Sequence, residues 1–192
     1  DTPGLRFGPK DRKLGANALP TCQMFLADCR VPAANLLGPE NGAFRLGLAA
    51  IDGARVYVGA LCTGMGQAAL DLAITYARRR RAFGRPIGEF QGLQWMLADL
   101  ATEVEAGRLL TYKAAAQLDA GEPATVAAAH AKRYGADMAL RAASQAMQVF
   151  GANGYLRDYP VERYLRWAKM CAYIDGTTQI QQVVIARSLF KD

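Results

Sequence analysis

The hydrophobic and polar positions of roughly the first 38 residues follow the pattern of short strands separated by turns. Strand-like stretches at residues 5–8 and 22–27 are flanked by prolines and glycines, as strands commonly are. Two strands this short do not form a stable sheet by themselves. We therefore expect residues 1–38 to be the end of a β domain whose other strands are absent from this chain.

Beyond residue 38 the apolar positions recur at the spacing of amphipathic helices, so residues 39–192 are expected to form one α-helical domain. Helices are predicted at residues 42–80, 89–120, 124–150, 161–170 and 179–189, with turns rich in glycine and proline between them. On the first helix the apolar residues that recur at helical spacing are Leu46, Ala49, Ala50, Leu61, Met65, Ala68, Ala69 and Leu72. On the second helix the residues expected to face inward are Leu93, Met96, Leu97, Leu100, Val104 and Leu109. The predicted fold class is mainly α: an antiparallel helical bundle with short loops, preceded by a few β-strands.

Four glycines, Gly53, Gly59, Gly64 and Gly66, lie inside the first predicted helix. Each costs roughly 1 kcal/mol relative to alanine on an exposed helix face. Close helix packing or the approach of a ligand would be the reason to keep them. The two tryptophans, Trp95 and Trp167, are also expected to serve packing.

The net charge of +6 is partly concentrated in four consecutive arginines, residues 78–81. Such a run most often marks a solvated helix end, and phosphate binding is the main alternative. No aromatic residues interleave with the arginines and no nucleic-acid motif is present, so no nucleic-acid partner is expected. The hydrophobic content of 52% is high enough for a folded core.

The cysteines, Cys22, Cys29, Cys62 and Cys171, form no C-x-x-C pair, and His130 is the single histidine. We therefore expect no metal site, reduced thiols and a cytoplasmic protein; His130 is expected to be structural or exposed. No run reaches ~18 uninterrupted apolar residues, so no membrane span is expected. The chain opens DTPG, without a methionine or a signal-peptide pattern, and is expected to be a fragment of something longer.

Several blocks, in this order, resemble the acyl-CoA dehydrogenase family. The blocks are DTPGLRFG at the start, DCRVP from Asp28, DGAR from Asp52, YARRRRAFGRPI from Tyr76 with Phe90-Gln91 after it, QVFGANGY from Gln148 and IDGTTQIQ from Ile174. The resemblance covers essentially the whole chain. It implies the end of the β domain followed by the C-terminal helical domain, with FAD bound at a subunit interface and an acyl-CoA as the substrate.

By this resemblance Asp175 occupies the position of the catalytic base, which is a glutamate in most members of the family. The implied reaction removes the α-proton of an acyl thioester while a β-hydride moves to the flavin. Asp is one methylene shorter than Glu, and a base must lie within ~3 Å of its proton. Asp175 is therefore a true base in an adjusted site, as in nitroalkane oxidase, or it serves a differently placed branched or cyclic acyl group, or the position is degenerate and activity weak.

The resemblance also implies substrate-binding roles for Asp52, Arg55 and Gly176. Asp52 and Arg55 are one helical turn apart, so a simple ion pair is the plain alternative to lining the acyl-CoA site. An arginine beside the base would favour its ionised form. The backbone N–H of Gly176 or Asp175 would polarise the thioester oxygen, as in an oxyanion hole.

Ten residues are implied to hold FAD, and Arg80 is the one expected to reach the pyrophosphate of the neighbouring subunit's cofactor. Arg78, Arg79 and Arg81 are expected to be solvated. Plain alternatives exist for the others: capping and packing around Gln91 and residues 148–152, and an N-cap at Thr177 or Thr178. The other nine are Phe83, Gln91, Gln148, Val149, Phe150, Gly151, Ala152 (where the family usually has a second glycine), Thr177 and Gln179.

Three hypotheses for function follow. The first is FAD-dependent α,β-dehydrogenation of an acyl-CoA to the enoyl-CoA, with electrons passed to an electron-transfer flavoprotein, in a homodimer or homotetramer. The second is a flavin oxidase of the same superfamily, similar to nitroalkane oxidase. The third is a chain that acts only as an oligomerisation module.

Overall fold

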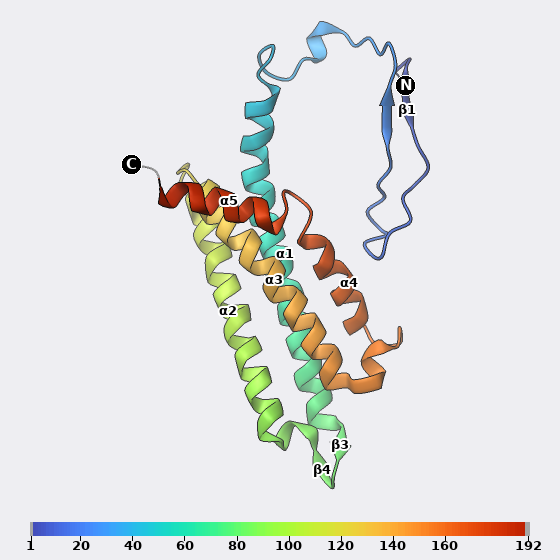
Figure 1. Cartoon of the computed structure of the whole chain (residues 1–192), viewed down its shortest axis with the longest axis vertical. Helices are drawn as coiled ribbons and strands as arrows, with labels where there is room; N and C mark the ends of the chain where they lie inside the picture. Colours follow the sequence, from blue (N-terminus) through green and yellow to red (C-terminus); the bar gives the residue numbers. More distant parts are fainter. Residues whose placement is uncertain (1, 191–192) are drawn as a thin grey trace. The chain divides into compact units, whose positions relative to one another are not determined.

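The computed structural model describes residues 2–190 and consists mainly of α-helices, which confirms the predicted fold class (Figure 1). The chain divides into two compact units, Asp1–Ala50 and Ile51–Asp192. This division falls inside the first helix. The domain limits given above, residues 1–38 and 39–192, stay a prediction.

The first unit contains a two-stranded antiparallel sheet formed by β1 (Leu5–Phe7) and β2 (Met24–Leu26). Leu5 pairs with Leu26 and Phe7 with Met24. Both strands lie within the predicted stretches. Their apolar side chains are largely exposed in this chain, Phe7 by 65%. A short 3-10 turn, η1 (Ala33–Asn35), follows before the first helix begins.

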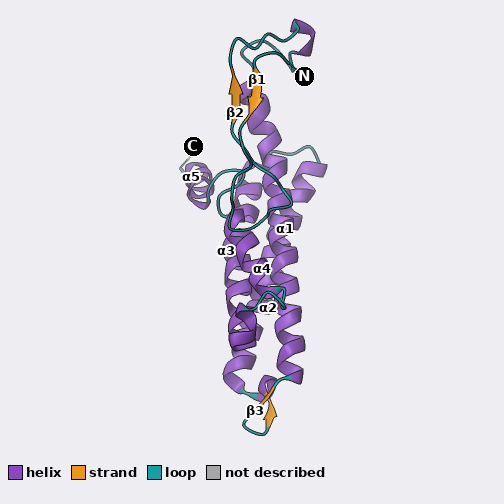
Figure 2. Ribbon diagram, turned by 90° about the vertical axis from the view of Figure 1, so that its right-hand side faces the viewer, coloured by secondary structure: helices purple, strands orange, loops and turns teal. Residues whose placement is uncertain are grey.

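The helices of the bundle lie within two residues of the predicted bounds (Figures 1 and 2). They are α1 (Ala43–Arg79), α2 (Gln91–Asp119), α3 (Thr125–Phe150), α4 (Val161–Cys171) and α5 (Thr178–Leu189). Short 3-10 segments, η2 (Ile87–Glu89) and η3 (Gly151–Tyr155), precede α2 and follow α3.

A small hairpin between α1 and α2 was not predicted from the sequence. Its strands are β3 (Arg81–Ala82) and β4 (Arg85–Pro86). The two residues between them, Phe83 and Gly84, have φ of 51° and 79°, as a tight hairpin turn requires. Phe-Gly is not one of the usual Asn-Gly or Asp-Gly signals for such a turn, which is why the pattern gave no sign of it.

Helix α3 lies at the centre of the bundle and packs against α2, α4 and α5. Its buried face consists largely of alanines, which allow neighbouring helices to approach closely. The alanines with at most 1% exposure are Ala128, Ala129, Ala131, Ala136, Ala139, Ala142, Ala143 and Ala146. Leu100 and Val104 of α2 and Ala69 and Leu70 of α1 complete the main hydrophobic cluster on this side.

Two of the four glycines inside α1 serve the close packing that was predicted. A Cβ on Gly66 would lie 2.5 Å from the Sδ of Met138, and one on Gly59 would lie 3.0 Å from the Oγ1 of Thr111. At Gly53 and Gly64 no atom lies within 4 Å of the corresponding position. At those two glycines this chain shows no close helix packing, and the approach of a ligand stays a prediction.

Several apolar residues of the first two helices are exposed, among them Leu109, which was predicted to face inward. Leu61 and Leu109 are exposed by 42% and 60%, and Trp95 by 62%; Leu46, Ala49 and Ala50 are exposed as well. Periodicity identifies the apolar face of a helix but does not say whether the same chain covers it. The exposed His130 and the partly buried Trp167 agree with the predictions for them.

Among the described residues, α1 is long and apolar enough to cross a membrane, with a mean hydropathy of 1.3 over its most apolar window. The expectation of no span rested on uninterrupted apolar runs, and a window average tolerates the polar residues that interrupt them. Of that window, 33% is buried inside the protein. The core helix of a folded protein can meet the same criterion. Length and composition therefore do not decide whether α1 spans a membrane, and the expectation of no span stays a prediction.

Candidate functional site

The turn between α4 and α5 holds Asp175 and Gly176 in an unusual backbone conformation. Their φ angles are 52° and 91°, both in the left-handed region. Asp tolerates this region better than most residues, and Gly adopts it without steric cost. Thr177 then opens α5: its side-chain oxygen accepts from the backbone N–H of Ile180 at 3.3 Å. The N-cap predicted at Thr177 or Thr178 is therefore formed by Thr177.

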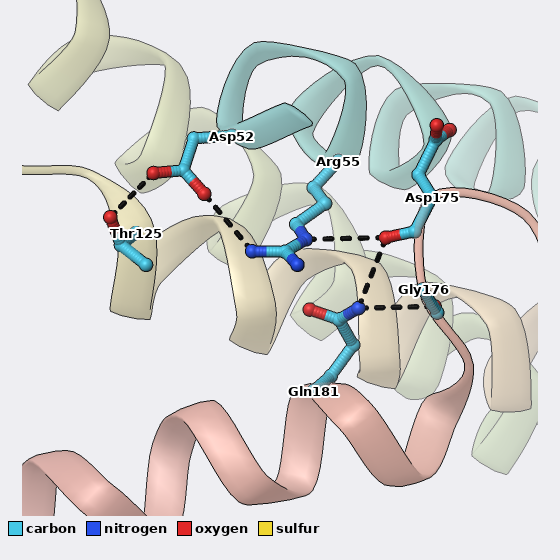
Figure 3. A network of polar contacts seen from close by, with 6 residues as sticks. All are labelled: Asp52, Arg55, Thr125, Asp175, Gly176 and Gln181. Carbon is cyan, nitrogen blue, oxygen red and sulfur yellow. Dashed lines mark hydrogen bonds and ion pairs between the residues drawn. The ribbon is translucent and has the colours of Figure 1, made fainter. Parts of the chain in front are cut away.

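The structure brings the predicted residues Asp52 and Arg55 of α1 to this turn (Figure 3). The Nη1 of Arg55 lies 3.0 Å from Asp52, and its Nε donates to the main-chain oxygen of Asp175 at 3.3 Å. Thr125, at the start of α3, donates to the other carboxylate oxygen of Asp52. The Asp52–Arg55 ion pair is thus present, and Arg55 also lies beside Asp175, so the two readings of this pair hold together. Arg55 is only 6% exposed.

The contact from Arg55 goes to the backbone of Asp175 and not to its carboxylate. Figure 3 shows the Asp175 carboxylate pointing away from Arg55 and Gln181. Arg55 therefore fixes the main chain of the turn and leaves the carboxylate oxygens of Asp175 out of the polar network. This arrangement differs from the direct support of the carboxylate that the sequence suggested.

Two residues of the site were missed in the sequence, Lys132 on α3 and Gln181 on α5. Gly176 O accepts hydrogen bonds from Lys132 Nζ at 2.6 Å and from Gln181 Nε2 at 3.0 Å. Gln181 Nε2 also donates to Asp175 O at 3.3 Å. Both side chains are fully buried.

A signal for Lys132 was present in the helical spacing. Ala128 and Ala136 lie four residues before and after it and are buried, so periodicity places Lys132 on the core face of α3. Burial lowers the pKa of Lys132, and this effect outweighs the opposite influence of the nearby Cys62, Cys171 and Asp175. Its N–H groups can donate to Gly176 O whether or not the amine is charged.

A second part of the predicted site is a hollow of about 350 Å³ at the C-terminal end of α3. It brings together two sequence blocks that are far apart in the chain. Asn153 Nδ2 donates to the hydroxyl of Tyr76 at 2.9 Å, and Tyr76 stacks on Phe150 at 4.1 Å between ring centres. The hollow is lined by Tyr76, Arg80, Ile87, Gln148, Val149, Phe150, Gly151, Ala152 and Asn153.

The hollow is open to a ligand on the side of Gly151. This glycine has φ of 60°, and no atom lies within 4 Å of the place where a Cβ would be. Val149 and Phe150 are each only 6% exposed, so they offer a ligand little surface. Ala152, which stands where the family usually has a second glycine, is exposed and also lines the hollow.

Two other predicted cofactor residues, Phe83 and Gln91, do not line this hollow. Phe83 is 94% exposed at the tip of the β3–β4 hairpin, with its ring edge-on to Phe90 at 6.1 Å. Arg85 lies 4.2 Å above the Phe90 ring. Gln91 is exposed at the first residue of α2. These residues are available to a neighbouring molecule rather than to the hollow of their own chain.

Comparison with known proteins now identifies the family. Residues 42–190 match the model of the acyl-CoA dehydrogenase C-terminal domain, which is well over half of the chain. The chain belongs to the acyl-CoA dehydrogenase family. Its similarity to individual members is high along its full length.

Three similar proteins illustrate this relationship to acyl-CoA dehydrogenases. The Bacillus subtilis protein "Probable acyl-CoA dehydrogenase YngJ" is 45% identical over 191 residues, which are 100% of this chain and 50% of that protein. A solved structure described as butyryl-CoA dehydrogenase from Megasphaera elsdenii has a TM-score of 0.97 at 39% identity, covering 99% of this chain and 50% of its own. Another, described as the electron transferring flavoprotein of Acidaminococcus fermentans, has a TM-score of 0.97 at 42% identity, covering 100% and 50%. The chain thus spans about half the length of the relatives it matches.

The residues of the hollow fit part of the FAD expected in an acyl-CoA dehydrogenase. A guanidinium, a glutamine amide and an open glycine backbone surround one hollow, and such groups suit phosphate oxygens and a nucleoside. Thr177 and the exposed Gln179 lie elsewhere, at the start of α5. Figures 1 and 2 place the β3–β4 hairpin at one end of the bundle and α5 toward the other.

The separation of these two groups can be estimated along α3. Lys132 contacts the turn before α5, whereas Gln148 lines the hollow. At ~1.5 Å rise per residue, these two positions are roughly 24 Å apart along the helix. One chain of this acyl-CoA dehydrogenase domain therefore does not bring all ten predicted FAD residues into one site.

Proposed function

We propose that the protein containing this chain catalyses the FAD-dependent α,β-dehydrogenation of an acyl-CoA thioester and that Asp175 is its base. The observation that carries the proposal is the geometry of the Asp175–Gly176 turn. The main chain of the turn is held by buried side chains, while the carboxylate of Asp175 points away from them (Figure 3). A base needs this combination of a fixed position and free oxygens.

The turn also supplies donors for the thioester oxygen. In a trans peptide the C=O and the N–H point in opposite directions, and the described residues contain no cis peptide bond. Arg55 and Gln181 hold the Asp175 carbonyl inward, so the N–H of Gly176 faces the other way. An N–H placed there would stabilise negative charge on the thioester oxygen while Asp175 takes the α-proton.

FAD, when bound, supplies the acceptor for the hydride that leaves the β-carbon. We infer that each FAD is shared by two copies of the chain. One copy would contribute Thr177 and Gln179, and the other would contribute Arg80, the residues around Gln148–Ala152 and the exposed Phe83 and Gln91. The estimated separation of the two groups within one chain supports this arrangement, and a homodimer or homotetramer follows from it.

Electrons are proposed to leave through an electron-transfer flavoprotein, and the cytoplasm is the proposed compartment. The first proposal is supported by the likeness to a chain in the structure described as an electron transferring flavoprotein. The second is supported by the four cysteines, which are all free thiols. Reduction of a purified electron-transfer flavoprotein by enzyme and substrate would test the first.

The decisive experiment replaces Asp175 in the full-length protein and follows flavin bleaching after rapid mixing with an acyl-CoA. Asp175→Asn should keep FAD and bind the substrate. The rate of reduction should fall by the ~10²–10⁴-fold that general-base catalysis contributes. Asp119→Asn, at the exposed end of α2, is the matched control and should reduce at the normal rate. Unchanged reduction in Asp175→Asn would remove Asp175 as the base.

The variant Asp175→Glu separates the alternatives for the shorter side chain. If the site is adjusted to Asp, the extra methylene displaces the carboxylate and slows reduction. If Asp is a compromised substitute, the change should speed reduction of straight-chain substrates. The rates of flavin reduction with straight, branched and cyclic acyl-CoA substrates should also be compared between the unmodified protein and Asp175→Glu. This comparison tests whether Asp175 serves a branched or cyclic acyl group that binds in a different position.

A flavin oxidase is the second candidate, favoured by the aspartate at position 175. The two functions differ in their electron acceptor, so oxygen consumption with and without an external acceptor distinguishes them. A role as an oligomerisation module alone would appear as a chain that assembles but holds no flavin. We expect the isolated chain to bind FAD weakly or not at all and the full-length protein to hold it, so the flavin absorbance of both forms separates a truncated enzyme from a module.

A further inference from the structure

Lys132 is a lysine in the middle of a hydrophobic core. It has no solvent exposure and is the largest of the fully buried side chains. Lysine is rarely buried completely unless it is paired, and burying an ammonium group costs free energy. Within residues 2–190, Lys132 forms no ion pair, and its hydrogen-bond acceptor is a backbone oxygen. Core packing alone would be served better by an apolar side chain.

The position of its nitrogen indicates what the lysine does. Lys132 Nζ lies 2.6 Å from Gly176 O, directly after the proposed base. The preceding carbonyl, of Asp175, accepts from Arg55 and Gln181. Two consecutive carbonyl groups are therefore held by side chains from α1, α3 and α5. Both belong to residues with positive φ, so the turn depends on external contacts to keep its shape.

We propose that Lys132 is a positioning residue for Asp175: it holds Gly176 O in the core and so fixes the turn that carries the carboxylate. The peptide geometry gives the consequence. With Gly176 O turned inward, the N–H of Thr177 faces outward, as the N–H of Gly176 does. Neither N–H has a hydrogen-bond acceptor among the described residues. Lys132 thus sets the direction of an N–H beside the base without touching the substrate.

This inference rests on the proposed role of Asp175, and a single variant can test it because the fold should tolerate the change. Met has nearly the length of Lys and no polar atom. In Lys132→Met, Gly176 O would still accept from Gln181 Nε2 at 3.0 Å, so no buried carbonyl is left without a donor. Replacing a buried charge by an apolar side chain of similar volume is often neutral or stabilising.

The experiment uses the full-length protein with FAD added to saturation. Lys132→Met should lower the limiting rate of flavin reduction by about 10- to 100-fold, since a misplacement of ~1 Å costs on the order of 10²-fold. The dissociation constant for acyl-CoA should change by less than about threefold, because Lys132 does not contact the substrate. Lys10→Met is the control for the chemical change, because Lys10 is exposed and lies outside the helical bundle; its rate should be normal.

Backbone hydrogen exchange distinguishes positioning from general support of the core. If Lys132 holds the turn, exchange in Lys132→Met should rise at the N–H groups of Thr178 and Ile180, which donate to Ala172 O and Thr177 Oγ1, and stay unchanged along α1, α3 and α4. An unchanged reduction rate overturns the proposal, and so does faster exchange throughout those helices. If Asp175→Asn also reduces normally, the proposed function fails. The exchange at Thr178 and Ile180 then still decides whether Lys132 holds the turn.

Discussion

Arg55 and Asp175 are 120 residues apart in the chain, yet the Nε of Arg55 donates to the main-chain oxygen of Asp175 at 3.3 Å. The same guanidinium binds Asp52 one turn earlier on α1. One buried arginine thus joins α1, the longest helix of the bundle, to the turn between α4 and α5. The contact orients the backbone of the proposed base and leaves its carboxylate free for a substrate.

A first prediction concerns Arg80, the single arginine of the run at 78–81 that lines the hollow. In the full-length protein, Arg80→Ala should weaken FAD binding by about 10- to 100-fold. Loss of a hydrogen bond to a charged group costs roughly 1.5–3 kcal/mol, and ~1.4 kcal/mol corresponds to tenfold. Fluorescence titration of the flavin-free protein with FAD measures the effect.

The neighbouring arginines provide the control for this measurement. Arg78 is exposed and does not line the hollow, so Arg78→Ala should change FAD affinity by less than about threefold. Arg81 donates to Gly84 O within the hairpin and is unsuitable because its loss would disturb the turn. Equal losses in Arg80→Ala and Arg78→Ala would show that the charge of the run matters and the position of Arg80 does not.

The sequence predicted the helices well because their apolar spacing and the glycine and proline turns are local signals. The β3–β4 hairpin escaped prediction because its turn, Phe83-Gly84, uses an uncommon residue pair. The residues Asp52, Arg55, Asp175 and Gly176 came from a family resemblance, and the fold brings them together. Lys132 lies in none of the family blocks, and Gln181 ends the IDGTTQIQ block without a role implied for it. Their roles depend on where α3 and α5 meet the turn.

The sequence could not predict which apolar faces the chain covers itself. Leu100 and Leu109 lie on the same helix and have the same side chain, yet one is 1% and the other 60% exposed. Leu100 is buried and Leu109 is exposed because of where α1 and α3 pack against α2. Tertiary and quaternary packing are not encoded in the local period of a helix.

A second prediction uses the ion pair between Glu162 and Arg166 on α4. Two hydrogen bonds join them, at 2.7 and 2.9 Å, and the bond to Arg166 is the main reason that the pKa of Glu162 is lowered. A carboxyl group with a lowered pKa stabilises the folded state above its unfolded pKa. That contribution is lost as the pH falls through the lower pKa of the folded state.

Glu162→Gln should therefore reduce the free energy of unfolding by roughly 0.5–1 kcal/mol at pH 7. The difference from the unmodified chain should shrink below the ordinary carboxyl pKa of 4.5 and vanish once Glu162 is protonated in both states. Urea unfolding at a series of pH values measures it. Glu105→Gln is the control, because the Glu105–Arg108 pair is more exposed and should contribute close to nothing. A difference that grows toward acid pH would contradict the assignment.

A third prediction concerns assembly through the outer face of α2. Trp95, Leu109 and Tyr112 are each exposed by 60% or more, and their spacing puts them on one side of the helix. Tyr112 also borders a shallow hollow shared with Ala60, Thr63 and Gly64 of α1. Aromatic residues are enriched in the cores of interfaces between protein chains. We expect this face to join two copies of the chain, as the proposed sharing of FAD requires.

The unmodified chain should therefore have the mass of a dimer or a tetramer by light scattering at tens of micromolar. Leu109→Lys places a charge in the proposed interface and should shift the mass toward the monomer. The helical content should not change, because Leu109 packs little within its own chain. Leu118→Lys is the matched control: it makes the same change at an exposed position on the opposite side of α2, so the assembly should persist. A monomeric mass for the unmodified chain, or equal dissociation in both variants, would show that this face is not the interface.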